Sequence, residues 1–261
     1  MLIINADDFG LDGAHNQAIV QCFHEGLCSS ATLMPNMPGF EEACQLVHEA
    51  ELTDHVGMHL VLTYGQPLTD RMGRLSRFCD DERRFRLSET RPVFSLSRVE
   101  QEALATEIRA QISRCRGYGV PITHIDSHEH VHTEWAVASV LIPVARAEGI
   151  PYIRLIRNCG AGISLLRRVY KYLLNAKLNR SALARTEYFG TVEDYLYLQQ
   201  LLEPNTAVSF EVMIHPVFDD NRMLIDGSFD VSRGIGLREE IEKIDGFEDA
   251  VSFNGTRYGS R

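Results

Sequence analysis

The chain has 261 residues, with 26 Lys or Arg against 36 Asp or Glu, so its formal net charge at pH 7 is −10. A content of 44% hydrophobic and 24% charged residues is typical of a compact globular protein and excludes the disordered and fibrous classes. The acidic balance excludes a general nucleic-acid-binding surface. Apolar runs such as residues 142–145 are far shorter than the roughly 20 residues that cross a bilayer, so no transmembrane segment is predicted.

The beginning of the chain and its cysteines indicate the compartment. Residues 1–5 lack the basic start and long apolar stretch of a secretory signal. The six cysteines form no CxxC pair and lie mostly in apolar helical patterns, which favours reduced core thiols over disulfides or a cysteine-zinc site. Because no linker interrupts the chain, we expect residues 1–261 to form a single cytoplasmic domain.

Short apolar segments alternate with segments of helical period along most of the chain, the pattern of a parallel α/β domain. Strands are predicted at residues 2–6, 30–34, 56–62, 122–126, 152–156, 187–189, 207–214 and 250–253. Helices are predicted at residues 14–23, 38–47, 97–117, 135–148 and 164–180, the third of them opened by a capping box of Ser97 and Glu100.

Residues 63–95 lose this periodicity and are rich in Gly, Pro and charged side chains, so we predict a loop-rich insertion that faces the substrate. The sequence has no GxGxxG or Walker loop. About seven strands with intervening helices therefore favour a (β/α) barrel, deformed or incomplete, over a nucleotide-binding open sheet. In such barrels the chemistry lies at the carboxyl ends of the strands.

Two carboxylates, Asp7 and Asp8, stand where the first strand is predicted to end. Adjacent carboxylates repel unless a cation neutralises them, and a divalent metal ion can do so while leaving one of them free as a base. The alternative is a turn in which one of them caps the following helix.

Histidines follow at the ends of later strands. His59 comes two residues after Gly57, which permits a close backbone approach, although a lone histidine there is also typical of a satisfied core residue. Residues 124–132 hold four of the ten histidines, and strand alternation would place His124, Asp126 and His128 on one face.

A carboxylate and a histidine, Glu211 and His215, are placed four residues apart on a late strand. An unperturbed pKa near 6.5 makes His215 a candidate general acid, with a hydrogen-bonded strand-end histidine as the alternative. Taken together, these residues suggest a hydrolytic site in which Asp8, His59 and His128 bind a metal ion between Asp7 and His215.

At these residues the sequence resembles the YdjC-like carbohydrate deacetylase family, which includes chito-oligosaccharide deacetylases and hopanoid-associated members. Four motifs match in chain order: residues 5–11 (NADDFGL), residues 57–63 (GMHLVLT) with 65–68 (GQPL), residues 123–132 (THIDSHEHVH) and residues 215–216 (HP). The resemblance implies a deformed (β/α) barrel related to the NodB-like deacetylases. It also implies metal-dependent removal of an acetyl group from an N-acetylated sugar.

Residue by residue, the resemblance assigns Asp8, His59 and His128 as ligands of Mg²⁺ or Zn²⁺. Asp7 matches the catalytic base and His215 the acid that protonates the leaving amine, while Glu211 is expected to orient His215 and to bind substrate.

The sequence departs from the family pattern in two places. Glu129 stands where many relatives have another histidine, and Val217 follows His-Pro where glycine is common. The first change adjoins a proposed ligand and can alter metal preference, whereas the second is expected to reshape only a loop over the sugar. Neither change removes a core catalytic group.

One segment is basic. Residues 149–186 carry eight basic residues and no acidic one, which leaves −18 on the remainder of the chain. One interpretation of this segment is a solvated amphipathic helix whose apolar side faces the barrel. A binding surface for an anionic substrate, such as a sugar on a lipid carrier at a membrane, or for an acidic face of a second subunit is the alternative, and Arg154 is the member expected to reach the substrate.

The sequence thus predicts a metal-dependent N-deacetylase acting on an N-acetylated sugar or oligosaccharide, including a glycan or lipid-linked precursor. The rivals are a metal-dependent phosphoesterase and a sugar-binding protein without turnover. We expect peripheral contact with a lipid-linked substrate rather than a membrane anchor, no nucleic-acid partner, and a homodimer.

Overall fold

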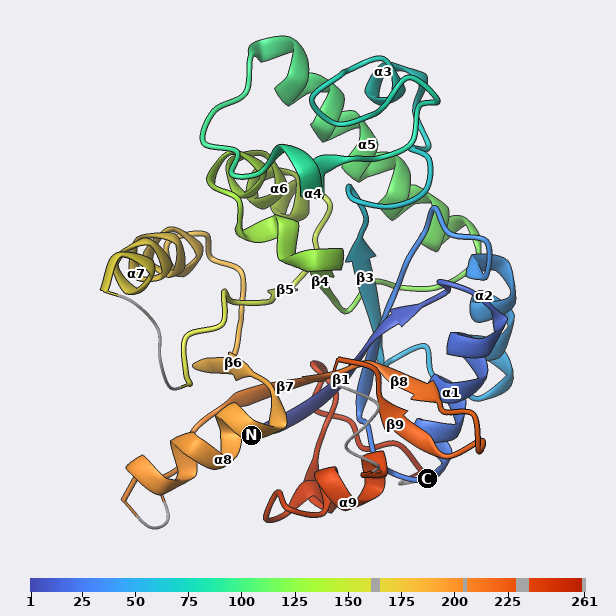
Figure 1. The fold of residues 1–261 in the computed structure, drawn as a ribbon, viewed down its shortest axis with the longest axis vertical. Helices are drawn as coiled ribbons and strands as arrows, with labels where there is room; N and C mark the ends of the chain where they lie inside the picture. The colour runs from blue at the N-terminus through green and yellow to red at the C-terminus, as the bar shows by residue number, and fades with distance from the viewer. Residues whose placement is uncertain (161–164, 204–205, 229–234, 260–261) are drawn as a thin grey trace.

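A computed structural model describes residues 1–160, 165–203, 206–228 and 235–259 of the chain. Seven strands form one parallel sheet in the order β5-β4-β3-β2-β1-β7-β6 (Figure 1). Their bounds are β1 (Leu2–Phe9), β2 (Ser30–Leu33), β3 (Val56–Leu60), β4 (His124–Ser127), β5 (Tyr152–Ile153), β6 (Tyr188–Gly190) and β7 (Phe210–Ile214).

The sheet is a curled half-barrel, which confirms the deformed, incomplete barrel expected from the sequence. β5 and β6 lie at opposite ends of the strand order. An isolated bridge between Tyr152 and Ala184, with a hydrogen bond from the Ile153 amide to the Ala184 carbonyl, spans part of the distance between them. The strands are buried on both faces, as parallel sheets covered by helices require, and this explains their nearly continuous apolar sequences.

Helices connect the strands and pack outside the sheet (Figure 1). The third predicted helix begins at its capping box, because the Ser97 side chain accepts from the Glu100 amide and the Glu100 carboxylate accepts from the Ser97 amide. The predicted helix at 135–148 also forms and contains Pro143. The bounds are α1 (Gly13–His24), α2 (Phe40–Glu49), α3 (Asp70–Gly73), α4 (Leu87–Thr90), α5 (Arg98–Gly117), α6 (Trp135–Ala147), α7 (Leu165–Asn179), α8 (Val192–Leu201) and α9 (Leu237–Ile241).

The core is a large cluster of buried apolar side chains drawn from most of the chain between Ile4 and Ile244, beside a small second cluster of Met34, Met37 and Val61. All six cysteines are buried in free form, so the expected reduced core thiols are confirmed. No helix among the described residues is both long and apolar enough to cross a membrane.

Several elements differ from the prediction. Residues 250–253 are not a strand: the Val251 amide bonds to the Leu2 carbonyl and the chain then turns, because the Gly255 amide bonds to the Ser252 carbonyl. An antiparallel pair formed by β8 (Pro216–Phe218) and β9 (Leu224–Asp226) was not predicted. Helices α8 and α9 were also missed.

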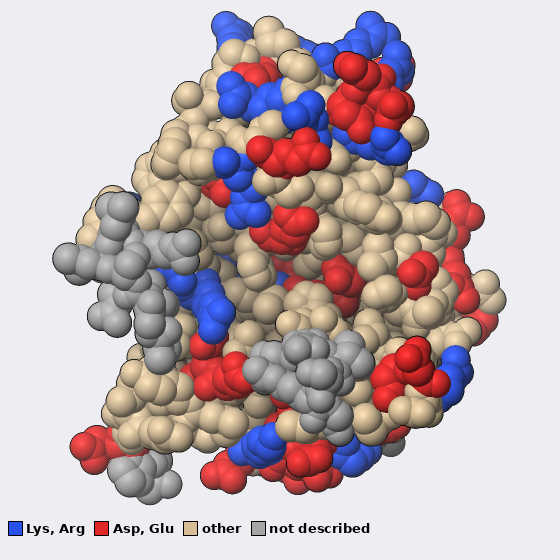
Figure 2. Space-filling model, viewed as in Figure 1, with Lys and Arg blue, Asp and Glu red and all other residues tan. Residues whose placement is uncertain are grey.

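The insertion at 63–95 contains the short helices α3 and α4 and a bridge between Cys79 and Phe85. Basic and acidic side chains alternate over the upper part of the face shown in Figure 2, where α3, α4 and α5 lie. Ion pairs join Arg71 to Glu102, Arg77 to Glu100, Arg83 to Asp70 and Arg84 to Asp80.

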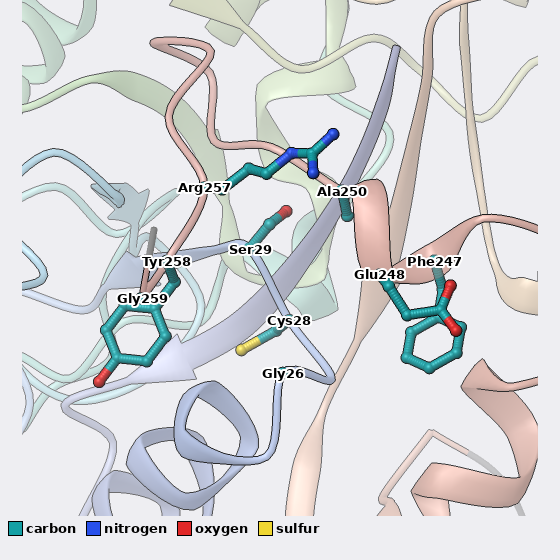
Figure 3. Close-up of a pocket in the computed structure, with 9 residues that line it drawn as sticks. All are labelled: Gly26, Cys28, Ser29, Phe247, Glu248, Ala250, Arg257, Tyr258 and Gly259. Atoms are coloured by element: carbon teal, nitrogen blue, oxygen red, sulfur yellow. The ribbon is translucent and has the colours of Figure 1, made fainter. Parts of the chain in front are cut away.

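A cavity of about 260 Å³ lies beside the segment that enters β2 (Figure 3). Cys28 and Ser29 line its middle in this view, between Tyr258 and Phe247. Because these residues adjoin the amino end of β2, the cavity is at the opposite edge of the sheet from the carboxyl ends, where barrels of this kind place their chemistry.

A substitution at Gly57 tests how closely β3 packs against β4. A Cβ at this position would lie 2.5 Å from both Nδ1 and the carbonyl oxygen of His124. We therefore expect Gly57→Ala to lower the free energy of unfolding by about 1–3 kcal/mol, as overpacking does, in urea denaturation.

The matched control is Gly117→Ala in α5, where an added Cβ meets nothing within 4 Å. This change should be neutral or stabilise the protein by up to about 1 kcal/mol. Equal effects of the two substitutions would contradict the close approach at Gly57.

Candidate active site

The candidate site lies at the carboxyl ends of the central strands. β1 brings Asp7 and Asp8 to this edge, and the register between β1 and β2 shifts between Ala6 and Phe9. Asp8 has a φ of 68°, a left-handed conformation that is uncommon outside glycine. Irregular pairing and a positive φ at one point re-aim neighbouring side chains, so both carboxylates can face the site.

A buried guanidinium lies beneath these residues. The guanidinium of Arg154, which follows β5, is fully buried and donates to both carboxylate oxygens of Asp7, at 2.6 and 2.7 Å. It also contacts Oδ2 of Asp126 at 2.7 Å and Oε1 of Glu211 at 2.5 Å. One arginine therefore binds three buried carboxylates from β1, β4 and β7.

This cluster sets the protonation of its acids. Burial would raise the pKa of Asp7, but the charge and hydrogen bonds of Arg154 outweigh it and hold the pKa well below the usual range. For Glu211 burial prevails and raises the pKa to about 7. Its second oxygen, Oε2, is buried without a hydrogen-bond partner among the described residues.

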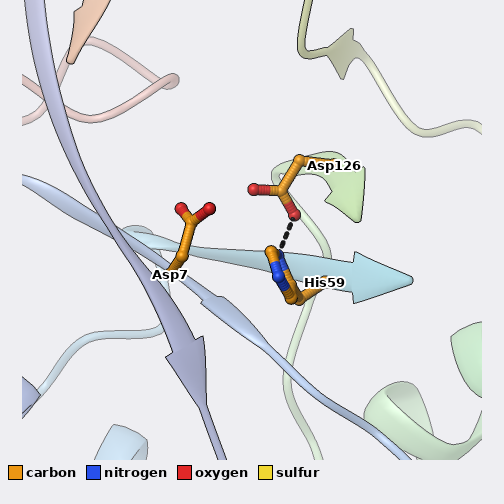
Figure 4. A group of neighbouring side chains, drawn as sticks. All are labelled: Asp7, His59 and Asp126. Atoms are coloured by element: carbon orange, nitrogen blue, oxygen red, sulfur yellow. Dashed lines mark hydrogen bonds and ion pairs between the residues drawn. The ribbon is translucent and has the colours of Figure 1, made fainter. Parts of the chain in front are cut away.

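Asp7, His59 and Asp126 form a group whose spacing could hold a metal ion (Figure 4). One potential ligand atom from each lies within 4.8 Å of the others. Both Asp7 oxygens, however, bind Arg154, while the Asp126 oxygens bind Arg154 and His59. A metal ion between them would have to compete with a guanidinium already in place.

The two ring nitrogens of His59 have different surroundings. Nδ1 lies 2.7 Å from Oδ1 of Asp126, and Nε2 lies 3.3 Å from Oδ1 of Asp8. Burial opposes the imidazolium, but Asp126 and then the other acids raise the pKa of His59 to about 10. Without a metal ion the ring therefore carries a proton on Nε2, which a metal ion would have to replace. The Asp126 carboxylate on Nδ1 directs Nε2 toward Asp8, as in carboxylate–histidine–metal triads.

Asp8 supplies an unsatisfied group at the same point. Its Oδ1 is buried and has no hydrogen-bond partner in the described parts of the chain, although His59 lies close by. Burial would raise the pKa of Asp8, but the nearby His59 lowers it overall, so this oxygen is anionic. A buried anionic oxygen facing an imidazole nitrogen fits a divalent cation chemically.

His128 lies on the other side of His59, with the two ring centroids 6.0 Å apart. Its Nδ1 is 2.6 Å from the hydroxyl of Thr63, which leaves Nε2 available. Burial lowers the pKa of His128 to about 4, so the ring is neutral at physiological pH, the form that binds metals. Glu129 and His130 follow with φ values of 50° and 56°, so the chain turns sharply after His128.

The alternation expected over residues 124–128 ends early. β4 stops at Ser127, and the 3₁₀ segment η1 (His128–Thr133) begins at His128. His124 points into the core, where it stacks on Phe253 and its Nε2 lies 3.0 Å from Oδ1 of Asn5.

The other two histidines of this cluster contact residues other than His59. His132 contacts the Ser127 hydroxyl and His130 packs against Phe189.

His215 is the most exposed of the expected catalytic residues, with 26% of its side chain accessible. Its Nε2 lies 3.9 Å from Oδ2 of Asp7, so the candidate general acid and general base are neighbours. Nδ1 contacts the Ser228 hydroxyl and lies 3.9 Å from Asp226. Among the described residues, Ser228 and Asp226 therefore orient the ring of His215. Glu211, which was expected to do so, contacts Arg154 instead.

The family profile described as YdjC-like protein matches residues 1–242. The chain belongs to the YdjC-like family. Among curated relatives, a protein of Brevibacillus brevis named carbohydrate deacetylase is 32% identical over 91% of this chain and 89% of its own. A protein of Proteus mirabilis named chitooligosaccharide deacetylase is 30% identical over 87% of this chain and 85% of its own.

A solved structure shares the fold of this YdjC-like chain. It is a protein of Enterococcus faecalis V583 for which a role in cellobiose-phosphate cleavage has been suggested, with a TM-score of 0.72. The two chains are 24% identical, and the match covers 97% of each. At this identity the likeness extends to the fold alone.

Two residues expected to bind substrate, Arg154 and Glu211, lie in the interior of this YdjC-like protein. Both side chains are fully buried. Neither has accessible surface with which to contact a sugar, because each is enclosed with the other acids beneath the site.

Sequence reasoning also missed three contributors. Asp126 was noted only as a neighbour of histidines, yet it bonds to His59 and Arg154. Thr63, the contact of His128, was quoted only as part of a motif. Asp226 lies on the unpredicted strand β9, so the sequence held no signal for it.

Arg154→Met should be strongly destabilising. It would leave Asp7, Asp126 and Glu211 buried without their cation, and breaking a buried ion pair from one side costs about 3–5 kcal/mol. We expect a loss of at least that size in the free energy of unfolding from urea denaturation at neutral pH.

Arg71→Met is the control, because the ion pair of Arg71 with Glu102 is about half-exposed on both sides. Surface pairs of this kind contribute about 0–1 kcal/mol. If the two substitutions had similar effects, Arg154 would not be the cation that stabilises the site.

Proposed function

We propose that this YdjC-like protein is a metal-dependent hydrolase that removes the acetyl group from an N-acetylated sugar or oligosaccharide. The relatives named carbohydrate deacetylase and chitooligosaccharide deacetylase support the reaction class. The observation that carries the proposal is the buried Oδ1 of Asp8, which accepts no hydrogen bond from the described residues and lies 3.3 Å from Nε2 of His59, with His128 alongside. These are the groups that a hydrolytic metal site needs.

Asp8, His59 and His128 would hold the divalent ion, Mg²⁺ or Zn²⁺. The alternative set with Asp7 and Asp126 is less favourable because Arg154 already neutralises both carboxylates. Asp126 instead fixes the tautomer and direction of His59, and Thr63 does the same for His128. A bound divalent cation supplies Lewis-acid polarisation of the acetamide carbonyl and increased acidity of water.

Asp7 would accept the proton of the attacking water. The bidentate contact with Arg154 keeps this carboxylate ionised and fixes its position. A carboxylate with a lowered pKa is a weak base, so it needs a water of increased acidity, and this is consistent with metal dependence.

His215 would donate a proton to the leaving amine. It is partly exposed, so a substrate can reach it, and it lies beside Asp7. The Ser228 hydroxyl and Asp226 hold its Nδ1 side, which leaves Nε2 directed toward Asp7. Arg154 and Glu211 act as positioning residues, because they are buried and reach the site only through Asp7 and Asp126.

The phosphoesterase alternative rests on the same metal ligands and on the basic segment. Two arginines of that segment already have acidic partners, because Arg154 is enclosed by three carboxylates and Arg157 pairs with Asp194. Contact with a lipid-linked substrate, a cytoplasmic location and a homodimer stay predictions from the sequence.

Asp7→Asn tests the base. We expect the variant to retain the metal content of wild type and to lose a factor on the order of 10² or more in turnover, the scale of a lost general base. The measurement is acetate release from N-acetylated mono- and oligosaccharides by metal-reconstituted protein. Wild-type turnover in Asp7→Asn would exclude the role, and phosphate release from phosphorylated sugars without acetate release would favour the phosphoesterase.

His128→Ala tests the ligand set. Loss of one of three ligands should abolish both metal retention after dialysis and acetate release. His24→Ala is the control: His24 ends α1 and stacks on Tyr258, which lines the cavity at the amino edge of the sheet, so this variant should keep both. Full metal occupancy in His128→Ala would transfer the role to another histidine of the cluster.

A further inference from the structure

An aromatic side chain with no role in the mechanism above lies beside the site. Tyr64 follows Thr63 on the loop after β3 and is 56% exposed. Its ring centroid is 6.5 Å from that of His128, with the two planes tilted by 46°. An exposed aromatic ring therefore borders the candidate metal site.

The backbone that carries Tyr64 is fixed by several contacts. Nδ2 of Asn36 donates to the carbonyls of Tyr64 and Gln66, each at 3.0 Å. Gly65 has a φ of +69°, and a Cβ there would lie 3.0 Å from Sδ of Met37. The loop is thus held against the segment after β2, and the ring of Tyr64 is presented from a defined position.

Thr63 links this loop to the chemistry. Its side chain is buried and contacts Nδ1 of His128, while the next side chain, Tyr64, projects to the surface. Of these two successive residues, Thr63 thus holds the ring of His128 and Tyr64 lies beside it at the surface. A ligand whose reacting group lies at His128 would have its body within reach of the Tyr64 ring.

The chemistry of the ring selects the kind of ligand. A tyrosine offers a rigid apolar face with a polar tip and loses little conformational entropy on binding. A pyranose ring presents axial C–H groups on one face and hydroxyls around its edge, so it can pack on such a surface while its hydroxyls stay hydrated. An isolated phosphate or a small acyl group has no comparable face.

We propose that Tyr64 is the platform on which the pyranose ring nearest the reacting acetamide packs. This inference rests on the proposed deacetylase function and adds a binding residue to it. The contact is made in the ground state and the transition state alike, so its loss should raise KM and leave kcat nearly unchanged.

The test compares Tyr64→Ala and Tyr64→Phe with wild type, using N,N′-diacetylchitobiose as the probe and acetate as the readout. For Tyr64→Ala we expect a KM increase of about 5- to 50-fold, kcat within about twofold, and unchanged metal content. Tyr64→Phe keeps the ring and should stay within about threefold of the wild-type KM. Tyr172→Ala, which removes a 73% exposed tyrosine on α7, is the control and should match wild type.

Binding of the same disaccharide to the metal-loaded Asp7→Asn protein, measured by calorimetry with and without Tyr64→Ala, separates this inference from the proposed function. Weaker binding in the double variant supports the platform even if wild type releases no acetate, in which case only the deacetylase proposal fails. An unchanged KM and affinity in Tyr64→Ala would overturn the inference. Loss of metal in Tyr64→Ala would also overturn it, since Tyr64 would then support His128. Equal losses in Tyr64→Phe and Tyr64→Ala would show that the hydroxyl binds and not the ring face.

Discussion

The site depends on one buried guanidinium. Arg154 brings together carboxylates from three strands, Asp7, Asp126 and Glu211, in a region without water access. Such a cluster is costly to desolvate and is weak support for overall stability, but its removal from one side would leave uncompensated charge. The cluster fixes the directions of the side chains around it. Because Arg154 holds Asp7 and Asp126 from the interior, Asp8 and Nε2 of His59 face the candidate metal site.

This arrangement divides two adjacent aspartates between different tasks. Asp7 is enclosed by Arg154 and Asn5 and stays ionised, whereas Asp8, in a left-handed conformation, keeps a buried oxygen that accepts no hydrogen bond from the described residues and faces His59. Strained or unsatisfied groups persist where the surrounding structure holds them, and they concentrate at functional sites. The same principle extends to the turn after His128, where Glu129 and His130 both have positive φ.

The fold could be predicted from sequence because buried parallel strands leave an apolar signature, which located seven strands of the sheet. The short pair β8–β9 left no such signature, since its strands are only three residues each. Single motifs pointed to Asp7, Asp8, His59, His128 and His215, which the structure brings to one edge. The roles of Arg154 and Glu211 could not be predicted, because whether a charged side chain at a strand end faces solvent or other charges depends on contacts between distant strands.

The most direct test is anomalous diffraction from crystals of the protein reconstituted with Zn²⁺ or Mn²⁺. The account predicts a single strong peak bounded by Asp8, His59 and His128, with Arg154 still bound to Asp7. A peak between Asp7, His59 and Asp126, with the guanidinium displaced, would contradict it. Asp7 would then be a metal ligand and could not be the separate base that the account requires.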